Sequence, residues 1–381
     1  MGKSRVVIPI RNIDQNLRLL QDNLLNDGSI NFDNANLDSL LKQLPIDKPI
    51  TKLSHPEVRY EVTDHCNASC IMCPRDEHEH GRAHGIMDQD KYEKSIDEVV
   101  SLGAKNIVLT GFGEPMLDKK LELKIAYAKK QGLFTYIISN GSVLNSKRAE
   151  KILKAGLDEI RISFYGMGSD TYNTVMQGLD FETTKNGLLK FIKLRDEQNF
   201  KTKIQISYLT LPENEKDEQA FQNFWEPLVD AIEIWRPHNF GDGRDYRDRD
   251  EGQIEVVKTT CGRPETGALQ IQWDGEVIPC CYDYNNKIVL GNAFEQPVLE
   301  ILNEKKYRLL RYAHKAGLFN LFPYCDQCDQ LLPHSDALVY SNRHNLPAEE
   351  AVKLSNTDLY NLAEGSEMNK ENLNKKYKAK V

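Results

Sequence analysis

The stretch Cys66-Asn67-Ala68-Ser69-Cys70-Ile71-Met72-Cys73, here called the front loop, decides how the rest of the sequence is interpreted. It directly follows a predicted strand over residues 58–63, so its three cysteines lie where a strand ends. Three soft thiolates this close in sequence suit an iron–sulfur cluster or a zinc ion. Three protein ligands on a four-iron cluster would leave one iron open, so that a substrate or cofactor could bind it directly.

Zinc is the main alternative for the front loop, and inert buried thiols are a further one. A structural zinc ion takes four protein ligands, usually from two Cys-x-x-Cys pairs, and no second pair follows nearby. A neighbouring histidine could supply the missing ligand; the candidates are His65, His78, His80 and His84. The last three could instead belong to a lid or to a solvated loop.

Predicted strands and helices alternate after the front loop. Six strands are predicted, at residues 58–63, 106–110, 134–139, 159–164, 203–209 and 231–235. Five helices are predicted between them, at residues 92–102, 121–131, 147–155, 184–198 and 219–228. This alternation predicts parallel βα units, whose loops at the carboxyl ends of the strands meet on one ligand-binding face. A partial barrel and a doubly wound sheet fit the alternation equally well.

The front loop resembles the CxxxCxΦC signature of radical S-adenosylmethionine (SAM) enzymes, with Met72 at the apolar position Φ. Companion motifs follow in the order that this family has. Gly111-Phe112-Gly113-Glu114-Pro115 follows the second strand and is similar to the family's GGEP motif, with Phe112 in place of one glycine. Ser139-Asn140-Gly141 ends the third strand, and Ser163 ends the fourth.

This resemblance covers roughly residues 56–240 and implies an α/β fold, a partial (β/α)6 TIM-like barrel. It implies that Cys66, Cys70 and Cys73 hold a [4Fe–4S] cluster whose open iron binds SAM. The residues that it implies as SAM contacts are Met72, Gly111, Gly113, Glu114, Pro115, Ser139, Asn140 and Ser163. Reductive cleavage of SAM would then release methionine and a 5′-deoxyadenosyl radical, which abstracts hydrogen from an unactivated C–H bond.

One segment departs from the family. Relatives often carry an arginine in a segment that resembles residues 172–178, and this chain has Val175, Met176 and Gln177 there. The identity of a cation facing the SAM carboxylate is therefore open.

Five further cysteines lie towards the C-terminal end: Cys261, Cys280, Cys281, Cys325 and Cys328. A hairpin with an Asp-Gly turn, predicted over residues 269–279, brings Cys280 back towards the start of the hairpin. One helix is predicted over residues 298–316. Four of the cysteines, Cys261, Cys280, Cys325 and Cys328, suffice to ligate every iron of one cubane, and zinc in the same four-cysteine site is the rival.

This second cysteine region resembles the C-terminal extension called SPASM in its shortened, twitch form. The resemblance implies one fully ligated auxiliary [4Fe–4S] cluster and therefore two [4Fe–4S] clusters in all. Cys281 is left over, and three roles stay open for it: structural burial, cluster ligation in place of Cys280, or hydrogen-atom donation to a substrate radical.

Composition excludes several classes of protein. The 381 residues include 49 Lys and Arg against 57 Asp and Glu, a net charge of -8, which gives no electrostatic reason to bind nucleic acid or an anionic membrane. No apolar run could span a bilayer or act as a signal-peptide core, so we expect a cytoplasmic protein. We expect four parts: an N-terminal segment, the barrel, an auxiliary-cluster domain and a polar, solvated tail, at residues 1–55, 56–240, 241–335 and 336–381.

Polar and aromatic residues near the exits of the fourth and sixth strands are candidate substrate contacts: Tyr165, Arg236, His238, Asn239 and Arg244. They suit a small polar molecule such as a sugar or an aminocyclitol. The auxiliary cluster would accept an electron from the substrate radical, giving a net oxidation, and a flavodoxin- or ferredoxin-like protein would supply reducing electrons. A peptide- or protein-modifying maturase and a non-catalytic zinc-binding scaffold are the alternatives.

Overall fold

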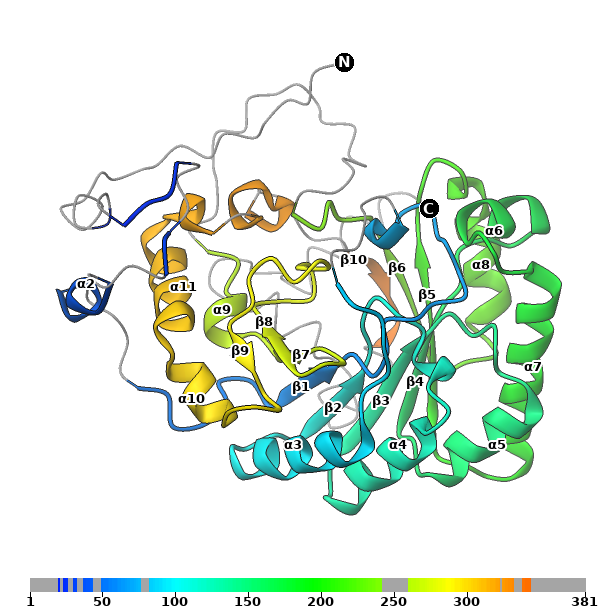
Figure 1. The fold of residues 1–381 in the computed structure, drawn as a ribbon. Helices are drawn as coiled ribbons and strands as arrows, with labels where there is room; N and C mark the ends of the chain where they lie inside the picture. The colour runs from blue at the N-terminus through cyan, green and yellow to red at the C-terminus, as the bar shows by residue number, and fades with distance from the viewer. Residues whose placement is uncertain are drawn as a thin grey trace.

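One curved sheet of ten strands organises the described part of the chain in this computed structural model (Figure 1). The structure describes residues 20, 23–26, 30–32, 37–43, 49–76, 82–241, 260–322, 324–331 and 338–343. The strands are β1 (Glu57–Tyr60), β2 (Asn106–Leu109), β3 (Phe134–Ser139), β4 (Glu159–Ser163), β5 (Lys203–Leu209), β6 (Ala231–Trp235), β7 (Leu269–Ile271), β8 (Glu276–Ile278), β9 (Gly291–Asn292) and β10 (Leu338–Ser341). Their order is β10-β6-β5-β4-β3-β2-β1-β7-β8-β9, so β10 and β9 are the two edges and the barrel is partial.

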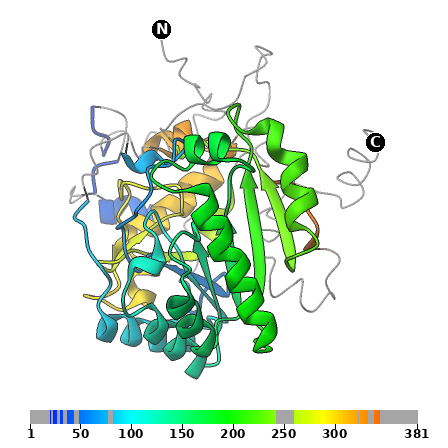
Figure 2. The ribbon, with the colours of Figure 1, turned by 90° about the vertical axis from the view of Figure 1, so that its right-hand side faces the viewer.

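Strands β1 to β6 lie side by side in chain order, and each is parallel to the next. Helices cover their outer face (Figures 1 and 2). These helices are α3 (Gln89–Ser101), α4 (Leu121–Lys130), α5 (Ser146–Lys154), α6 (Ser169–Val175), α7 (Phe181–Glu197) and α8 (Glu218–Trp225). The predicted partial (β/α)6 barrel is therefore confirmed, with β3, β5 and β6 at the predicted residues.

Alternation along the strands separates an apolar outer face from a polar inner face. On β1 the outward Tyr60 packs edge-on against Tyr92 of α3 at 5.2 Å, and its hydroxyl bonds Ser95 at 2.8 Å. The inward residues are charged: Arg161 of β4 stacks on Tyr136 of β3 at 4.1 Å and donates to Glu159 at 2.6 Å. A barrel of this kind is normally filled by branched apolar residues, so the polar interior suits a fold that holds polar ligands.

The second cysteine region extends the same sheet. Strand β7 pairs in parallel with β1, and β7 and β8 form the predicted antiparallel hairpin. The hairpin turn is longer than the predicted Asp-Gly pair: the amide of Gln272 donates to Glu276, and the amide of Gly275 donates to Gln272. Gly275 has a φ of 94°, which places a left-handed glycine at the end of a three-residue loop.

Two sequence predictions about the C-terminal region are wrong. The single helix predicted over 298–316 is two helices, α10 (Val298–Asn303) and α11 (Lys305–Ala316), because Glu304 between them is extended with φ -60° and ψ 152°. The side-chain amide of Asn303 bonds both the amide and the carbonyl of Ile50, at 2.7 and 2.8 Å, and so fixes this break.

The expected solvated tail from residue 336 is also wrong in part, because Leu338–Ser341 form β10 beside β6. The side chain of Asn342 accepts from the amide of Ile232 at 2.8 Å. Arg343 bonds Glu159 at 3.0 Å and Glu233 at 2.9 Å, both on the inner face of the barrel. The segment thus neutralises buried carboxylates that the six core strands leave there.

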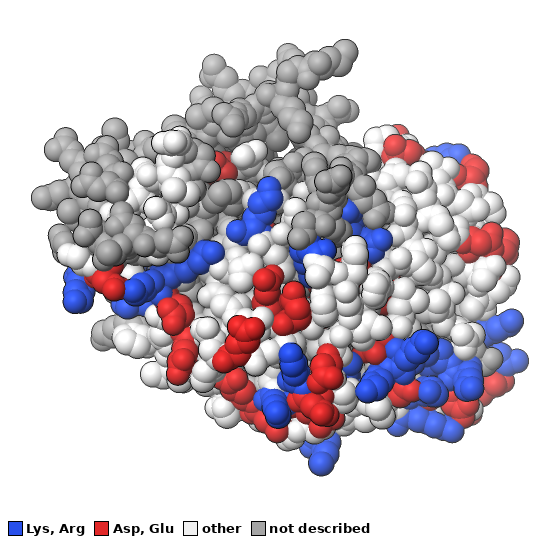
Figure 3. Space-filling view, in the orientation of Figure 1, with Lys and Arg blue, Asp and Glu red and all other residues white. Residues whose placement is uncertain are grey.

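The N-terminal residues that the structure describes pack on the second cysteine region. Helix α2 (Leu37–Gln43) contacts α11, and the ring of Phe32 lies 5.8 Å from that of Phe322. On the face seen in Figure 3, basic and acidic side chains are interspersed along the side where α3 to α5 lie. There, Glu122 pairs with Arg148 and Lys151 at 2.7 and 2.6 Å, so neighbouring charges compensate one another.

Candidate active site and cluster sites

The front loop leaves β1 at the carboxyl edge of the sheet, and its backbone is fixed by the end of α6. The amides of Ser69 and Ile71 donate to the carbonyls of Gln177 and Val175, at 2.8 and 3.0 Å. Segment 175–177, where relatives often carry an arginine, therefore positions the cysteine loop through its main chain. Helix α6 itself was not predicted, because its sequence of Ser, Asp, Thr and Asn has weak helix propensity.

All three front cysteines are half-buried free thiols on this loop. Burial raises the pKa of the Cys66 thiol. Tyr165, just past β4, lies close by: burial raises its pKa to about 12, and the charges of Cys70 and Cys73 add to that shift. Its backbone carbonyl accepts from the side-chain amide of Asn214 at 3.2 Å.

The GFGEP motif is packed tightly against the exit of β1. A Cβ on Gly113 would lie 2.1 Å from the carbonyl oxygen of Thr63, and one on Gly111 would lie 2.3 Å from the side chain of Glu61. Only glycine allows this approach. The motif is thereby held beside the front loop, and the amide of Glu114 donates to the carbonyl of His65 at 2.8 Å.

Glu114 joins the motif to the end of β3. One carboxylate oxygen accepts from the amide of Met116 at 2.9 Å and from the hydroxyl of Ser139 at 2.8 Å. The other accepts from the amide of Asn140 at 2.7 Å. Burial raises the pKa of Glu114, and these hydrogen bonds oppose that shift. Because a carboxylate offers about four acceptor positions, Glu114 retains capacity for one further donor.

Replacing Gly113 with alanine is expected to weaken SAM binding about tenfold or more, because the new methyl group must displace the backbone of Thr63 at an overpacking cost of about 1–3 kcal/mol. Calorimetric titration of the iron-loaded protein with SAM measures this. Gly187→Ala is the matched control, since its Cβ would lie at an ordinary 3.6 Å from Leu144. Equal SAM affinities in the two variants would contradict the prediction.

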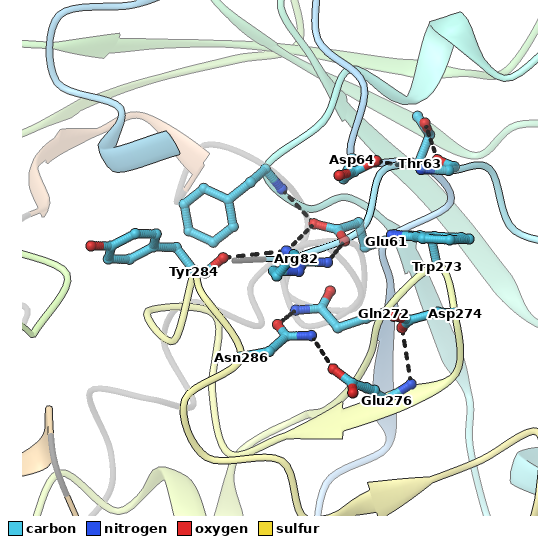
Figure 4. A network of polar contacts seen from close by, with 12 residues as sticks. Glu61, Thr63, Asp64, Arg82, Gln272, Trp273, Asp274, Glu276, Tyr284 and Asn286 are labelled. Atoms are coloured by element: carbon cyan, nitrogen blue, oxygen red, sulfur yellow. Dashed lines mark hydrogen bonds and ion pairs between the residues drawn. The ribbon is translucent and has the colours of Figure 1, made fainter. Parts of the chain in front are cut away.

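A buried ion pair connects the front loop side of the barrel with the second cysteine region (Figure 4). Arg82 pairs with Glu61, and both side chains are at most 4% exposed. Arg82 also donates to the carbonyl of Tyr284 at 3.3 Å, while Glu61 accepts from the amide of Phe112 at 3.0 Å. Burial raises the pKa of Glu61, and Arg82 opposes the shift. The sequence analysis missed this pair, because 21 residues separate its partners.

Phe112, which stands in place of a family glycine, begins an aromatic connection to the second cysteine region. Its ring lies 5.8 Å from that of Phe240 and 5.9 Å from that of Tyr284. Phe240 in turn meets Tyr282 edge-on at 5.5 Å, and Tyr284 meets Tyr324 at 6.1 Å. The GFGEP motif and the second cysteine region are thus in continuous packed contact.

A single cavity, here called the rear cavity, gathers the remaining predicted ligands. Cys261, Cys280, Cys325 and Cys328 all line it. Cys281, although adjacent to Cys280, is not among its lining residues. Arg263, Tyr282, His314 and Tyr324 also line the cavity, and the sequence analysis did not single out Arg263 or His314.

The four thiols of the rear cavity differ in acidity. Burial opposes ionisation of Cys261, but the neighbouring His314 and Arg263 lower its pKa to about 6. Burial and the charge of Cys281 raise the pKa of Cys280 to about 12. Cys261 is therefore the thiol best prepared to bind iron as a thiolate at neutral pH.

His238 and Asn239 hold the Cys325-x-x-Cys328 segment. The amide of Asn239 donates to Asp329 at 2.9 Å, and its side chain donates to the carbonyl of Gln327 at 2.8 Å. His238 bonds the side chain of Gln330 at 2.9 Å. These contacts place both residues next to the Cys325-x-x-Cys328 segment, and their role as substrate contacts stays a prediction.

The other predicted polar residues have separate positions. Arg236 is 45% exposed and pairs with Glu218 at 3.2 Å, on the rim of the barrel. His65 and His84 form a group with Asp64, whose ligand atoms lie within 4.8 Å of one another. Three further residues that the sequence analysis named lie outside the described residues: the candidate zinc ligands His78 and His80, and the candidate substrate contact Arg244.

The donor sets fit iron–sulfur clusters better than single zinc ions. Thiolates bound to one tetrahedral zinc at about 2.3 Å lie about 4 Å apart. Among the described residues, three or more ligand atoms come within 4.8 Å of one another only at Asp64, His65 and His84, and at neither cysteine group. No three of the described thiols are therefore as close to one another as the ligands of one tetrahedral zinc ion.

Comparisons with known proteins agree with this geometry. Residues 60–224 match the model of the radical SAM superfamily, and residues 261–329 match that of SPASM, an iron–sulfur cluster-binding domain. A tungsten-containing aldehyde ferredoxin oxidoreductase cofactor-modifying protein from Pyrococcus furiosus is 25% identical over 313 residues, which is 70% of this chain and 85% of that protein. A probable GTP 3′,8-cyclase from Methanococcus maripaludis is 28% identical over 138 residues, and the match spans 36% of this chain and 45% of that protein.

Solved structures share the fold. SuiB from Streptococcus suis, bound to its precursor peptide SuiA, has a TM-score of 0.55 at 15% identity, over 78% of this chain and 73% of that one. BtrN in complex with AdoMet and 2-DOIA has a TM-score of 0.50 at 21% identity, over 72% of this chain and 93% of that one. Within the described residues, no helix has the length and apolar character to cross a bilayer.

The two matched domains bind S-adenosylmethionine and [4Fe–4S] clusters, one of them an auxiliary cluster, and the predicted cofactors are thereby confirmed. This chain therefore contains a radical SAM domain at residues 60–224, and a SPASM domain at residues 261–329 follows it.

Proposed function

We propose that this radical SAM enzyme oxidises a small polar substrate and uses its auxiliary cluster as the electron acceptor. The observation that carries the proposal is the rear cavity, where four cysteines converge. Four protein ligands leave no iron of a cubane open, so this cluster suits electron transfer rather than direct substrate binding. With three further cysteines on the front loop, seven of the eight cysteines are used, which supports one auxiliary cluster, as in a twitch domain.

Each site has a distinct set of residues in this proposal. Cys66, Cys70 and Cys73 hold the SAM-binding cluster, and Cys261, Cys280, Cys325 and Cys328 hold the auxiliary one. Glu114 accepts a hydrogen bond from the SAM amino group, and Gly111 and Gly113 allow the backbone to approach it. When bound, the SAM-site cofactors would supply hydrogen-atom abstraction from an unactivated carbon.

The net reaction balances for an alcohol. A substrate carbinol would lose one hydrogen atom from carbon, one proton from oxygen to a base, and one electron, and would become a carbonyl. Bound SAM would supply the acceptor of the hydrogen atom, and the auxiliary cluster would supply the acceptor of the electron. A flavodoxin- or ferredoxin-like protein donates the electron that starts the cycle. The fold shared with BtrN, solved with the small molecule 2-DOIA, agrees with this size of substrate.

A peptide- or protein-modifying maturase is the second candidate function. The observation in its favour is the fold shared with SuiB, which was solved with its precursor peptide. The described N-terminal residues include one short helix, α2, and they pack on α11. Incubating the reduced enzyme and SAM with either a panel of aminocyclitols or candidate precursor peptides, followed by mass spectrometry, separates the two. Residence in the cytoplasm stays a prediction from the sequence, and the non-catalytic zinc scaffold is disfavoured by the thiol spacing.

Replacing Cys328 with alanine is expected to stop substrate oxidation while sparing uncoupled cleavage of SAM. The variant lacks one of four auxiliary ligands, but Cys328 lies on the rear cavity and not on the front loop. The iron content should fall from about eight to about four atoms per chain. Chromatography of 5′-deoxyadenosine and of substrate products measures both reactions. Normal product formation by this variant would overturn the electron-acceptor role.

A further inference from the structure

His314 lines the rear cavity together with the four cysteines. It lies in the last turn of α11, its residue is 2% exposed, and its ring packs edge-on against Phe319 at 5.1 Å. Its Nδ1 atom lies 3.9 Å from the sulfur of Cys261 and 3.3 Å from the hydroxyl of Thr260. Cys261 and Thr260 are thus the two groups that Nδ1 contacts.

The other ring nitrogen of His314 strengthens the case for a role at the cluster. Nε2 is buried and has no hydrogen-bond partner among the described residues. Leaving a buried polar atom unpaired destabilises the fold, so an apolar side chain would pack here more favourably. A histidine at this position therefore calls for a function, and Cys261 is the described thiol that its Nδ1 contacts.

We infer that His314 is a positioning residue that donates an Nδ1–H hydrogen bond to the Cys261 thiolate and thereby raises the reduction potential of the auxiliary cluster. Hydrogen bonds to ligating sulfurs withdraw electron density from them and favour the reduced cluster. This inference rests on the proposed assignment of Cys261 as an auxiliary-cluster ligand. It explains how an enclosed, fully ligated cluster is prepared to accept an electron from a substrate.

Arg263 has a different position near the same sulfur. Its guanidinium stacks on Tyr282 at 4.6 Å, and both terminal nitrogens donate to Gln330 at 3.1 Å. It contributes buried positive charge to the cavity, and its guanidinium also donates to the hydroxyl of Tyr282 at 3.5 Å. The His314 ring contacts the Cys261 sulfur through its Nδ1 atom, so the two side chains can be tested separately.

The test uses two substitutions in the full chain, loaded with iron and sulfide under anaerobic conditions. His314→Phe keeps the ring but removes both nitrogens, and His314→Asn keeps an amide donor near the Nδ1 position. Redox titration followed by electron paramagnetic resonance gives the midpoint potential of each cluster. We expect a lower auxiliary midpoint in His314→Phe, recovery of most of that shift in His314→Asn, and about eight irons per chain in both variants. The SAM-binding cluster in the same chain is the internal reference, and its midpoint should not change.

Several results would overturn the inference. An auxiliary midpoint in His314→Phe equal to that of the unaltered chain would show that His314 does not act on the cluster. Loss of about four irons in both variants would make His314 a ligand rather than a hydrogen-bond donor. Equal shifts of both clusters would indicate a general structural effect. Absence of a second cluster from the unaltered chain would instead refute the proposed function itself, so the two failures are distinguishable.

Discussion

Replacing Cys70 with alanine is expected to abolish formation of 5′-deoxyadenosine. The front loop offers three thiols, and its backbone is held by α6 at Ser69 and Ile71, on either side of Cys70. The two remaining thiols cannot hold a four-iron cluster with one open corner. The loss should therefore exceed the about 10–100-fold effect of removing an outer-shell partner of a metal ligand. Chromatographic assay with SAM and dithionite measures the product.

The iron content separates this effect from misfolding. The Cys70→Ala chain should retain about four irons, those of the auxiliary cluster, because the rear cavity is built from other segments. Cys281→Ala is the matched control, since Cys281 is a half-buried free thiol that is absent from the lining of that cavity. It should keep about eight irons and cleave SAM normally. A control chain with only about four irons would show that Cys281, and not Cys280, is a ligand.

The sequence predicted best those features whose determinants are close together in the chain. The front loop spans eight residues, and the GFGEP motif spans five. Each strand of the barrel coincides with a short run of residues that favour β-structure. Gly103 and Gly132, whose φ angles are positive, follow the ends of α3 and α4. The four cysteines of the rear cavity were also recognisable, because thiols in a chain of this length have few other uses.

The features that sequence reasoning missed depend on distant partners. The break at Glu304 is fixed by Asn303 through Ile50, 253 positions away in the chain. The inward Arg343 pairs with Glu159, 184 positions away. His314 reads as an ordinary residue of an amphipathic helix, and only the fold brings it to Cys261. Asn239 lies near the sixth strand, and only the fold brings its side chain to the Cys325-x-x-Cys328 segment, 88 positions away.

The buried Glu61–Arg82 pair gives the largest expected change in stability. Arg82→Met leaves the Glu61 carboxylate buried without its counter-charge, and breaking a buried pair in this way costs about 3–5 kcal/mol. Glu61→Gln is the converse change, because it removes the carboxylate with which the buried guanidinium of Arg82 pairs. The double variant removes both charges together, so it should be considerably more stable than the sum of the two single losses predicts.

Urea denaturation of the four chains under anaerobic conditions gives the coupling energy, provided that the denaturant slopes agree. Lys216→Met is the control, because the side chains of Lys216 and its ion-pair partner Asp170 are 66% and 73% exposed, so that solvent screens their attraction. The denaturation midpoint of this variant should not change. Additive single losses would show that Glu61 and Arg82 act independently. Strong coupling would instead identify this pair as the polar contact that holds the β1 exit, the Phe112 backbone and the Tyr284 loop in one arrangement. The SAM motif and the auxiliary domain would then depend on the same buried charge pair.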